Sequence, residues 1–254
     1  MKDVINHLDL FSGIGGFALA AQRIWKDKLN IVGFCEIEPY AQKVLNKNFP
    51  NVPIYNDIKE LNGRQFKDID IITGGFPCQD ISIAGYGAGI EGDRSGLWSE
   101  MFRIISEIRP KFALIENVAA ITFRGGSRVV SDLAEIGYDT EWQTISAAYV
   151  GALHRRNRMW FVSYPSNSRS EYSKHGEGQE NIKQSEMVRQ CEGSIFGNKR
   201  EFREEICSTE FVRKSNGIPN RMDRIRGLGN AIVPQVAEII MLRIKNVLCR
   251  MSNR

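Results

Sequence analysis

The chain of 254 residues contains no apolar run long enough to cross a membrane, and its N-terminus lacks the pattern of a signal peptide. Its five cysteines are scattered, and no CxxC or histidine-rich spacing that would hold a metal ion is present. The formal net charge is only +4, which permits a nucleic-acid partner without requiring one. We therefore expect a cytoplasmic protein with reduced thiols, no bound metal and no membrane partner.

Short apolar runs alternate with segments of helical period through the first two thirds of the chain, which is typical of a parallel sheet covered by helices. We predict strands at residues 6–11, 31–37, 52–57, 70–73, 112–116, 142–148 and 159–164. We predict helices at residues 17–25, 40–48, 97–108, 127–136 and 236–247. Length and pattern together predict an α/β fold with a mostly parallel, doubly wound sheet.

The composition changes after the last predicted strand. Residues 166–193 are rich in Ser, Glu, Lys, Gln and Gly and have too few apolar side chains to build a core, which predicts a loop. We predict a main domain at 1–164, a small and partly flexible appended region at 165–220, and a segment at 221–254 that returns to the main domain.

One cysteine follows a predicted buried strand and opens a glycine-rich loop. Residues 74–79 read GGFPCQ, so Pro77 fixes the backbone directly before Cys78. Open α/β sheets bind their ligands at the carboxyl ends of their strands, where this cysteine is expected. We interpret Cys78 as a candidate nucleophile, and the plain alternative is a small buried apolar residue, as most free cysteines are.

Three further strand ends carry residues suited to binding or catalysis. Residues 9–16 read DLFSGIGG, and such glycines allow a tight turn and the close approach of a ligand. Glu36 lies about 20 positions beyond that turn, where an acidic side chain can bind ribose hydroxyls. Residues 116–118 read ENV at the end of another apolar run. These features alone do not distinguish NAD from S-adenosylmethionine as the ligand.

The chain resembles the cytosine-C5 DNA methyltransferases along nearly its whole length. The matching motifs follow in order: DLFSGIGG at 9–16, Glu36, Asp57, GFPCQ at 75–79, ENV at 116–118, RNR at 156–158 and GNAIVP at 229–234. Each motif is weak alone, but the ordered set is specific. The resemblance implies a Rossmann-like methyltransferase sheet, an appended target-recognition region, and transfer of a methyl group from S-adenosyl-L-methionine to cytosine in double-stranded DNA, with S-adenosyl-L-homocysteine as the product.

The resemblance implies a cofactor site around the glycine turn. Glu36 is expected on the ribose and Asp57 near the adenine amino group, although Asp57 also suits an ordinary turn. The segment 229–231 is expected to complete the pocket. The implied cofactor-binding residues are Phe11, Gly13, Gly15, Glu36, Ile37, Asp57, Ile58, Pro77, Leu97, Asn230 and Ala231.

The resemblance also implies the chemistry. Carbon 5 of cytosine is too weakly nucleophilic to take a methyl group directly, so the Cys78 thiolate is expected to add first to carbon 6. A carboxyl group at Glu116 would then stabilise the charge that develops on the ring. Arg156 and Arg158 alternate on one strand and would point together at the base and its phosphate, unless they form only a charged strand edge. The family pattern usually has glutamine where this chain has His154.

A cytosine inside a duplex must be flipped out before a thiolate reaches its carbon 6. Residues 79–96 contain five glycines, which predicts a mobile loop able to close behind the base. Gln79, Ser82 and Arg94 are the candidate DNA contacts in this loop, with a plain flexible loop as the alternative.

Three alternatives stay open. The same chemistry on RNA is the closest, because one branch of the family methylates tRNA. An NAD-dependent dehydrogenase would leave Cys78, Glu116 and Arg158 unexplained, and a non-catalytic DNA-recognition subunit disagrees with the complete set of catalytic motifs. The polar-Pro-Pro-aromatic motif of amino-methylating enzymes is absent where it would be expected. We expect a bacterial or phage-encoded monomer, with a cognate restriction endonuclease as a further partner.

Overall fold

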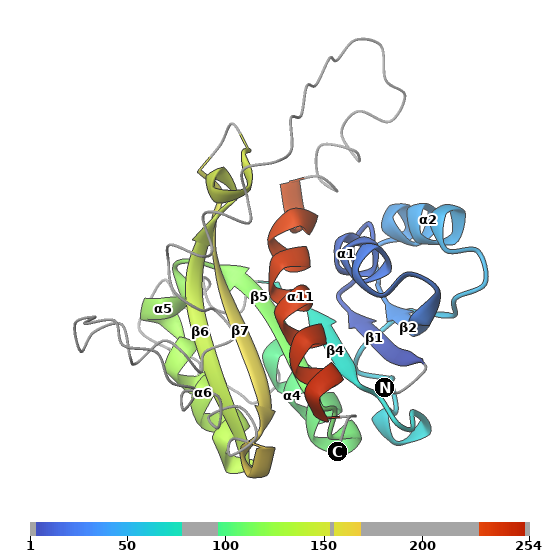
Figure 1. The fold of residues 1–254 in the computed structure, drawn as a ribbon. Helices are drawn as coiled ribbons and strands as arrows, with labels where there is room; N and C mark the ends of the chain where they lie inside the picture. The colour runs from blue at the N-terminus through green and yellow to red at the C-terminus, as the bar shows by residue number, and fades with distance from the viewer. Residues whose placement is uncertain (1–3, 78–95, 153–154, 169–228, 252–254) are drawn as a thin grey trace.

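The computed structural model describes residues 4–77, 96–152, 155–168 and 229–251, which form one sheet flanked by helices (Figure 1). The strands are β1 (Ile5–Leu10), β2 (Leu29–Cys35), β3 (Ile54–Tyr55), β4 (Ile71–Gly74), β5 (Phe112–Val118), β6 (Tyr138–Ser146) and β7 (Asn157–Pro165). The helices are α1 (Gly16–Trp25), α2 (Pro39–Asn48), α4 (Leu97–Ile108), α5 (Ile121–Arg124), α6 (Gly126–Glu135) and α11 (Pro234–Met251). Single 3-10 turns are η1 (Lys26–Lys28), η2 (Gly63–Gln65), η3 (Ala147–Val150) and η4 (Ser166–Ser168).

The seven strands lie in the order β3-β2-β1-β4-β5-β7-β6. All neighbours from β3 to β5 are parallel, whereas β7 runs antiparallel to both β5 and β6. The strand order turns back between β1 and β4, and open α/β sheets bind ligands at such a switch point. Because β7 is reversed, it starts at the edge where β5 ends, and Arg158 pairs with Val118 there.

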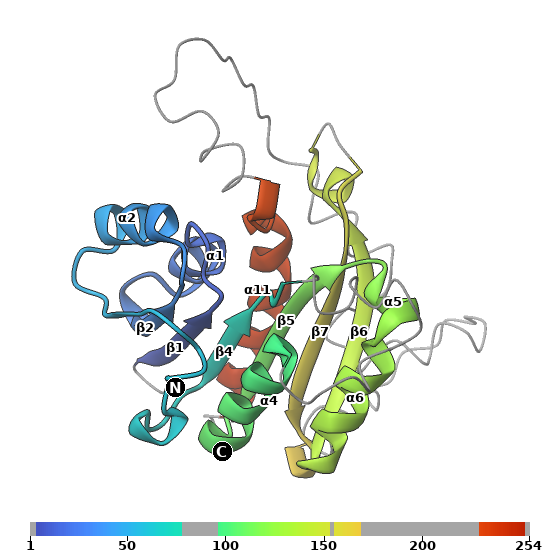
Figure 2. The ribbon, with the colours of Figure 1, turned by 180° about the vertical axis from the view of Figure 1, so that it is seen from behind.

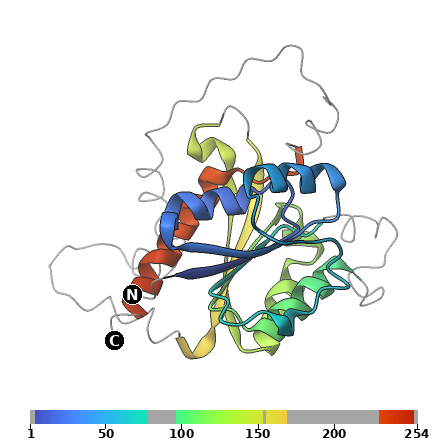
Figure 3. The same cartoon turned by 90° about the vertical axis from the view of Figure 1, so that its right-hand side faces the viewer.

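Helices cover both faces of the sheet, as Figure 3 shows from the side. On one face α1 and α11 pack on a core that includes Ile71 and Leu114, and on the other face α4 and α6 pack on a core that includes Ile72 and Ile115. Successive strand residues thus serve opposite faces, as the period of two requires. Figure 2, from behind, shows α4 and α6 across the sheet from α11. The α/β, mostly parallel, doubly wound fold is confirmed.

Most predicted elements lie within a few residues of the observed ones, because they rest on strong apolar periodicity. The strand expected at 52–57, however, is only the two residues Ile54–Tyr55, and residues 147–148 belong to η3. Both α2 and α11 begin at a proline, whose fixed φ suits the first turn of a helix. The strand expected from residue 142 begins at Tyr138, and the short helix α5 was not expected. The appended region at 165–220 lies almost wholly outside the described residues, so the domain division stays a prediction. In the described part of the chain, no helix is long and apolar enough to span a membrane.

Candidate active site

The turn after β1 is held in an unusual backbone conformation. Phe11, Gly13 and Gly15 have positive φ angles of 51°, 54° and 86°. For the non-glycine Phe11 this costs about 1–3 kcal/mol, a strain that is concentrated at binding and catalytic sites. A Cβ atom at Gly13 would meet nothing within 4 Å, whereas one at Gly15 would lie 2.9 Å from the Phe49 ring. The turn is therefore packed tightly at Gly15 and has open space at Gly13.

Glu36, directly after β2, lies against this turn. Its Oε2 accepts a hydrogen bond of 2.6 Å from the Gly13 N–H, and its Oε1 accepts one of 2.8 Å from the Glu38 N–H. The Gln42 side chain donates to the Glu36 carbonyl and to Asn56 Oδ1, which ties the end of β2 to the residue after β3. The structure thus brings Glu36 to the glycine turn, as the sequence predicted.

Asp57 lies at the same edge of the sheet. Burial, together with the charges of Glu36, Asp57 and Asp9, raises the pKa of the Cys35 thiol to about 12, so these three carboxyl groups lie near the end of β2. Asp57 Oδ1 also accepts the Lys59 N–H at 2.9 Å, which is the ordinary turn role. Asp57 therefore does cap a turn, and its role as the adenine contact stays a prediction.

The segment before α11 reaches the glycine turn from the far end of the chain. A Cβ atom at Gly16 would lie only 2.7 Å from the Ile232 side chain, so only glycine allows this close approach. Arg156 Nη2 donates a hydrogen bond of 3.0 Å to the Ala231 carbonyl. Ala231 and Ile232 therefore connect the arginine segment to the glycine turn, and Asn230 is the residue directly before them.

Glu116 occupies the end of β5 with its side chain buried. Its Oε1 lies 2.9 Å from Arg158 Nε in an ion pair, without the alignment of a hydrogen bond. Burial raises the pKa of Glu116 to about 7, although the charges of Arg158 and Arg156 act in the opposite direction. Glu116 is thus poised between its protonated and ionised forms near neutral pH. Arg158 lies in β7, whereas Arg156 directly precedes that strand, so the two do not alternate along one strand as expected. Both positive charges nevertheless lie near enough to Glu116 to act on its pKa.

The segment that leads to Cys78 lies directly against Glu116. A Cβ atom at Gly75 would lie 3.1 Å from Glu116 Oε2. The Asn117 side chain donates a buried hydrogen bond of 3.0 Å to the Phe76 carbonyl. No role was predicted for Asn117 from the sequence, although its place in the ENV motif was an available signal. The ends of β4 and β5 are therefore joined at the position where the motif pairs cysteine and glutamate.

A buried polar chain that the sequence did not predict joins β1 to β4. The Thr73 hydroxyl donates a hydrogen bond of 2.6 Å to Asp9 Oδ1 and lies 2.7 Å from His7 Nε2. Burial lowers the pKa of His7 to about 3 and raises that of Asp9 to about 8, so both side chains are neutral at neutral pH. The signal was two polar residues on the inward side of an apolar strand.

Several predicted residues have less or no structural description. Pro77 is exposed at the end of the first described range, Leu97 is half-buried at the start of α4, and Ile37 is 59% exposed beside Glu36. Ile58 is buried in the core beneath α4. Outside the described residues lie Cys78, Gln79, Ser82, Arg94 and His154.

The chain matches a known protein family. The model of the C-5 cytosine-specific DNA methylase family matches residues 5–222, most of the chain. The chain is a member of this family. The resemblance that the ordered motifs indicated is therefore confirmed: the family is the predicted one.

The curated relatives of this methylase family member are Type II methyltransferases. M2.BsuMI of Bacillus subtilis (strain 168) is 39% identical over 160 residues, which cover 60% of this chain and 40% of that protein. M.CviJI of Paramecium bursaria Chlorella virus IL3A is 38% identical over 61% of this chain and 41% of that protein. The aligned part of the chain thus spans less than half the length of these relatives.

Solved structures support the same fold. A putative DNA modification methyltransferase encoded within a prophage (E. coli) is 29% identical, with a TM-score of 0.52 over 64% of this chain and 47% of that chain. The methyltransferase EhMeth of Entamoeba histolytica has a TM-score of 0.65 over 96% of this chain and 99% of that chain. At 16% identity, EhMeth is evidence for the fold alone.

Proposed function

We propose that this family member is a DNA (cytosine-5)-methyltransferase that methylates a flipped-out cytosine through a covalent bond between Cys78 and carbon 6. The observation that carries the proposal is the position of Glu116. Its carboxyl group is buried, has a pKa near 7, pairs with Arg158 and lies against Gly75, three residues before the cysteine. Hydride transfer by a dehydrogenase would leave the buried Glu116, its pairing with Arg158 and the nearby Cys78 unexplained.

The glycine turn after β1 and Glu36 after β2 suit S-adenosylmethionine, which would supply a reactive methyl group. The open space at Gly13 leaves room for a ligand against the turn, and the exposed Ile37 offers an apolar surface beside Glu36. We assign the amino-acid portion to residues 11–15, the ribose to Glu36 and the adenine to Asp57, with Ile58, Pro77, Leu97, Asn230 and Ala231 completing the pocket.

In the proposed reaction, the chain's own residues prepare the base. The Cys78 thiolate forms a bond to carbon 6, and the ring electrons move toward carbon 5 and N3. Protonated Glu116 donates a hydrogen bond to N3, and Arg158 faces the carbonyl oxygen, so both stabilise the charge that develops. After carbon 5 is methylated, loss of its proton expels the sulfur of Cys78 and restores the aromatic ring.

The proposed substrate is double-stranded DNA, by analogy with the Type II methyltransferases that the chain matches. Gln79, Ser82 and Arg94 are proposed to contact the DNA around the flipped base. Arg156 is proposed to reach a neighbouring phosphate while its Nη2 donates to Ala231. A cognate restriction endonuclease remains the proposed functional partner.

We expect Glu36→Ala to weaken binding of S-adenosylhomocysteine by tenfold or more, because charged hydrogen bonds to the ribose contribute about 1.5–3 kcal/mol each. Isothermal titration calorimetry measures the change. Glu38→Ala is the matched control, since it removes the same charge two residues away from an exposed position with no capping hydrogen bond. Equal affinities for wild type and Glu36→Ala would remove Glu36 from the site.

The proposed function is tested by methyl transfer from S-adenosylmethionine with a labelled methyl group to duplex DNA and, in parallel, to tRNA. We expect label in DNA, recovered as 5-methylcytosine after digestion. Label in tRNA alone would favour the RNA branch of the chemistry. A purified, cofactor-binding protein that labels neither would contradict the proposal.

A further inference from the structure

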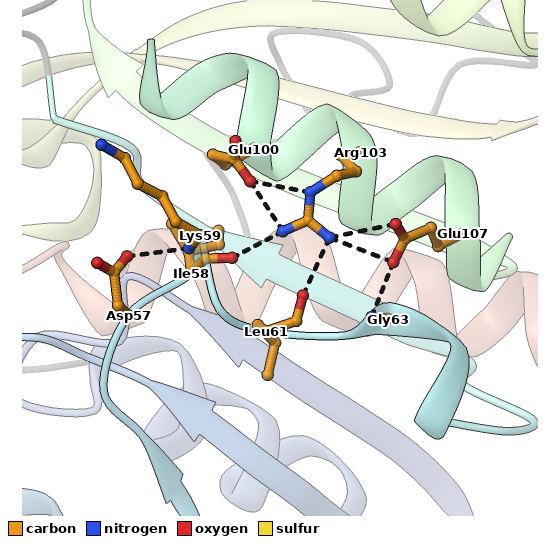
Figure 4. A network of polar contacts seen from close by, with 8 residues as sticks. All are labelled: Asp57, Ile58, Lys59, Leu61, Gly63, Glu100, Arg103 and Glu107. Carbon is orange, nitrogen blue, oxygen red and sulfur yellow. Dashed lines mark hydrogen bonds and ion pairs between the residues drawn. The ribbon is translucent and has the colours of Figure 1, made fainter. Parts of the chain in front are cut away.

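Arg103 on α4 fastens the segment that carries Asp57 and Ile58. Its Nη2 donates a hydrogen bond of 2.8 Å to the Ile58 carbonyl, and its Nη1 donates one of 3.0 Å to the Leu61 carbonyl (Figure 4). The segment between β3 and η2 consists of turns, in which the Ile58 carbonyl also accepts one backbone hydrogen bond of 3.3 Å from the Leu61 N–H. Arg103 thus adds a second, shorter hydrogen bond at the Ile58 carbonyl and connects the turn, through both carbonyls, to α4.

Two carboxylates hold the Arg103 side chain in place. Its Nε donates to Glu100 Oε2 at 2.9 Å, and its Nη1 lies 3.2 Å from Glu107 Oε1. Glu107 Oε2 also accepts the Gly63 N–H at 2.8 Å, which fixes the far end of the same segment (Figure 4). All three guanidinium nitrogens of Arg103 therefore donate hydrogen bonds. A lysine at this position could not make the same set, because its three N–H donors all lie on one nitrogen atom.

In this segment, apolar packing stabilises the fold, whereas the hydrogen bonds of Arg103 orient the backbone. Ile58 and Leu61 are 3% and 4% exposed and pack in the core beneath α4, so their side chains hold the segment down without help from Arg103. Packing of that kind tolerates small rotations of the backbone, whereas two directed hydrogen bonds do not. Loss of Arg103 should therefore misplace Asp57 rather than unfold the protein.

We propose that Arg103 is a positioning residue for the adenosine half of the cofactor site, acting through the carbonyls of Ile58 and Leu61 on Asp57. This inference rests on the proposed function, because it takes Asp57 as the adenine contact. Asp57 lies in a turn in which its Oδ1 accepts the Lys59 N–H and its carbonyl accepts the Glu60 N–H. This turn is tied to Gln42 through Asn56 on one side and to α4 through Arg103 on the other, so Arg103 sets where the whole turn lies.

The test is calorimetric binding of S-adenosylhomocysteine to the full chain. We expect Arg103→Met to weaken binding by roughly tenfold to a hundredfold, because a misplaced Asp57 would lose its charged hydrogen bond to the adenine. Arg128→Met is the matched control, because Arg128 is equally exposed on α6 and pairs with Asp132 one turn away. Among the described residues Arg128 bonds to Asp132 and not to the segment that carries Asp57, so its loss should leave affinity unchanged.

A double-mutant cycle separates positioning from general weakening. If Arg103 acts through Asp57, then Arg103→Met should cost little further affinity in an Asp57→Ala background. Should Arg103→Met fail to fold, Arg103→Lys keeps the charge between the two glutamates and is measured in its place. Additive losses, or wild-type affinity in the Arg103 variant, would overturn the inference and leave the proposed function standing. A wild-type protein that binds no S-adenosylhomocysteine would overturn both.

Discussion

Cys78→Ser is expected to abolish covalent capture of the protein by a DNA duplex that carries 5-fluorocytosine at the target site. Fluorine on carbon 5 cannot leave as a proton does, so the bond between sulfur and carbon 6 persists once the methyl group is transferred. A serine hydroxyl is a far weaker nucleophile at neutral pH and should not form that bond. Denaturing gel electrophoresis reports the complex as a band of increased mass.

The same substitution should lower methyl transfer to ordinary DNA by at least about a thousandfold, in line with the loss of other catalytic nucleophiles. Cys249→Ser is the control, since Cys249 is a free, half-buried cysteine on α11, away from the proposed chemistry. Binding of S-adenosylhomocysteine should survive both substitutions. Capture of Cys78→Ser as efficient as that of wild type would assign the nucleophile to another residue.

Glu116→Gln is expected to lower kcat/KM by about a hundredfold to a thousandfold, as removal of a preorganised transition-state donor does elsewhere. Glutamine keeps the size of the side chain, so Gly75 and Arg158 should retain their neighbours. The loss should appear in methyl transfer, while binding of S-adenosylhomocysteine stays near the wild-type value. An unchanged kcat/KM would show that Glu116 does not touch the reacting base.

The pH dependence gives this prediction a second readout. Burial raises the pKa of Glu116 to about 7, so the carboxyl group is protonated below that pH and loses its proton above it. Because the proposed role is to donate a hydrogen bond to N3, wild-type kcat/KM should fall as pH rises through about 7. In Glu116→Gln that alkaline decline should disappear, because the amide does not titrate.

Much of the sheet edge could be predicted from the sequence because its signals are local. The glycine turn and Glu36 follow two apolar runs, and parallel strands bring their carboxyl ends to one edge. The structure adds a hydrogen bond between Gly13 and Glu36 that no pattern contains. The reversal of β7 was also not predicted, although it is what brings Arg158 beside Glu116.

The contacts that the sequence missed are those between distant segments. Arg103 looked like one charged residue on an amphipathic helix, and nothing in its neighbourhood indicates that it meets carbonyls more than forty residues away. The same holds for Asn117 with Phe76, and for the close packing of Ile232 on Gly16. Hydrogen bonds of this kind depend on how the helices sit on the sheet, which periodicity does not specify.

The central claim is that this chain methylates carbon 5 of cytosine in DNA. The most direct measurement is sequencing of genomic DNA, with a readout for 5-methylcytosine, from a host that lacks its own cytosine methylation and expresses either wild type or Cys78→Ser. The account predicts 5-methylcytosine at one recurring short sequence with wild type and none with Cys78→Ser. Unmethylated DNA from cells that contain the folded, cofactor-binding wild-type protein would contradict it.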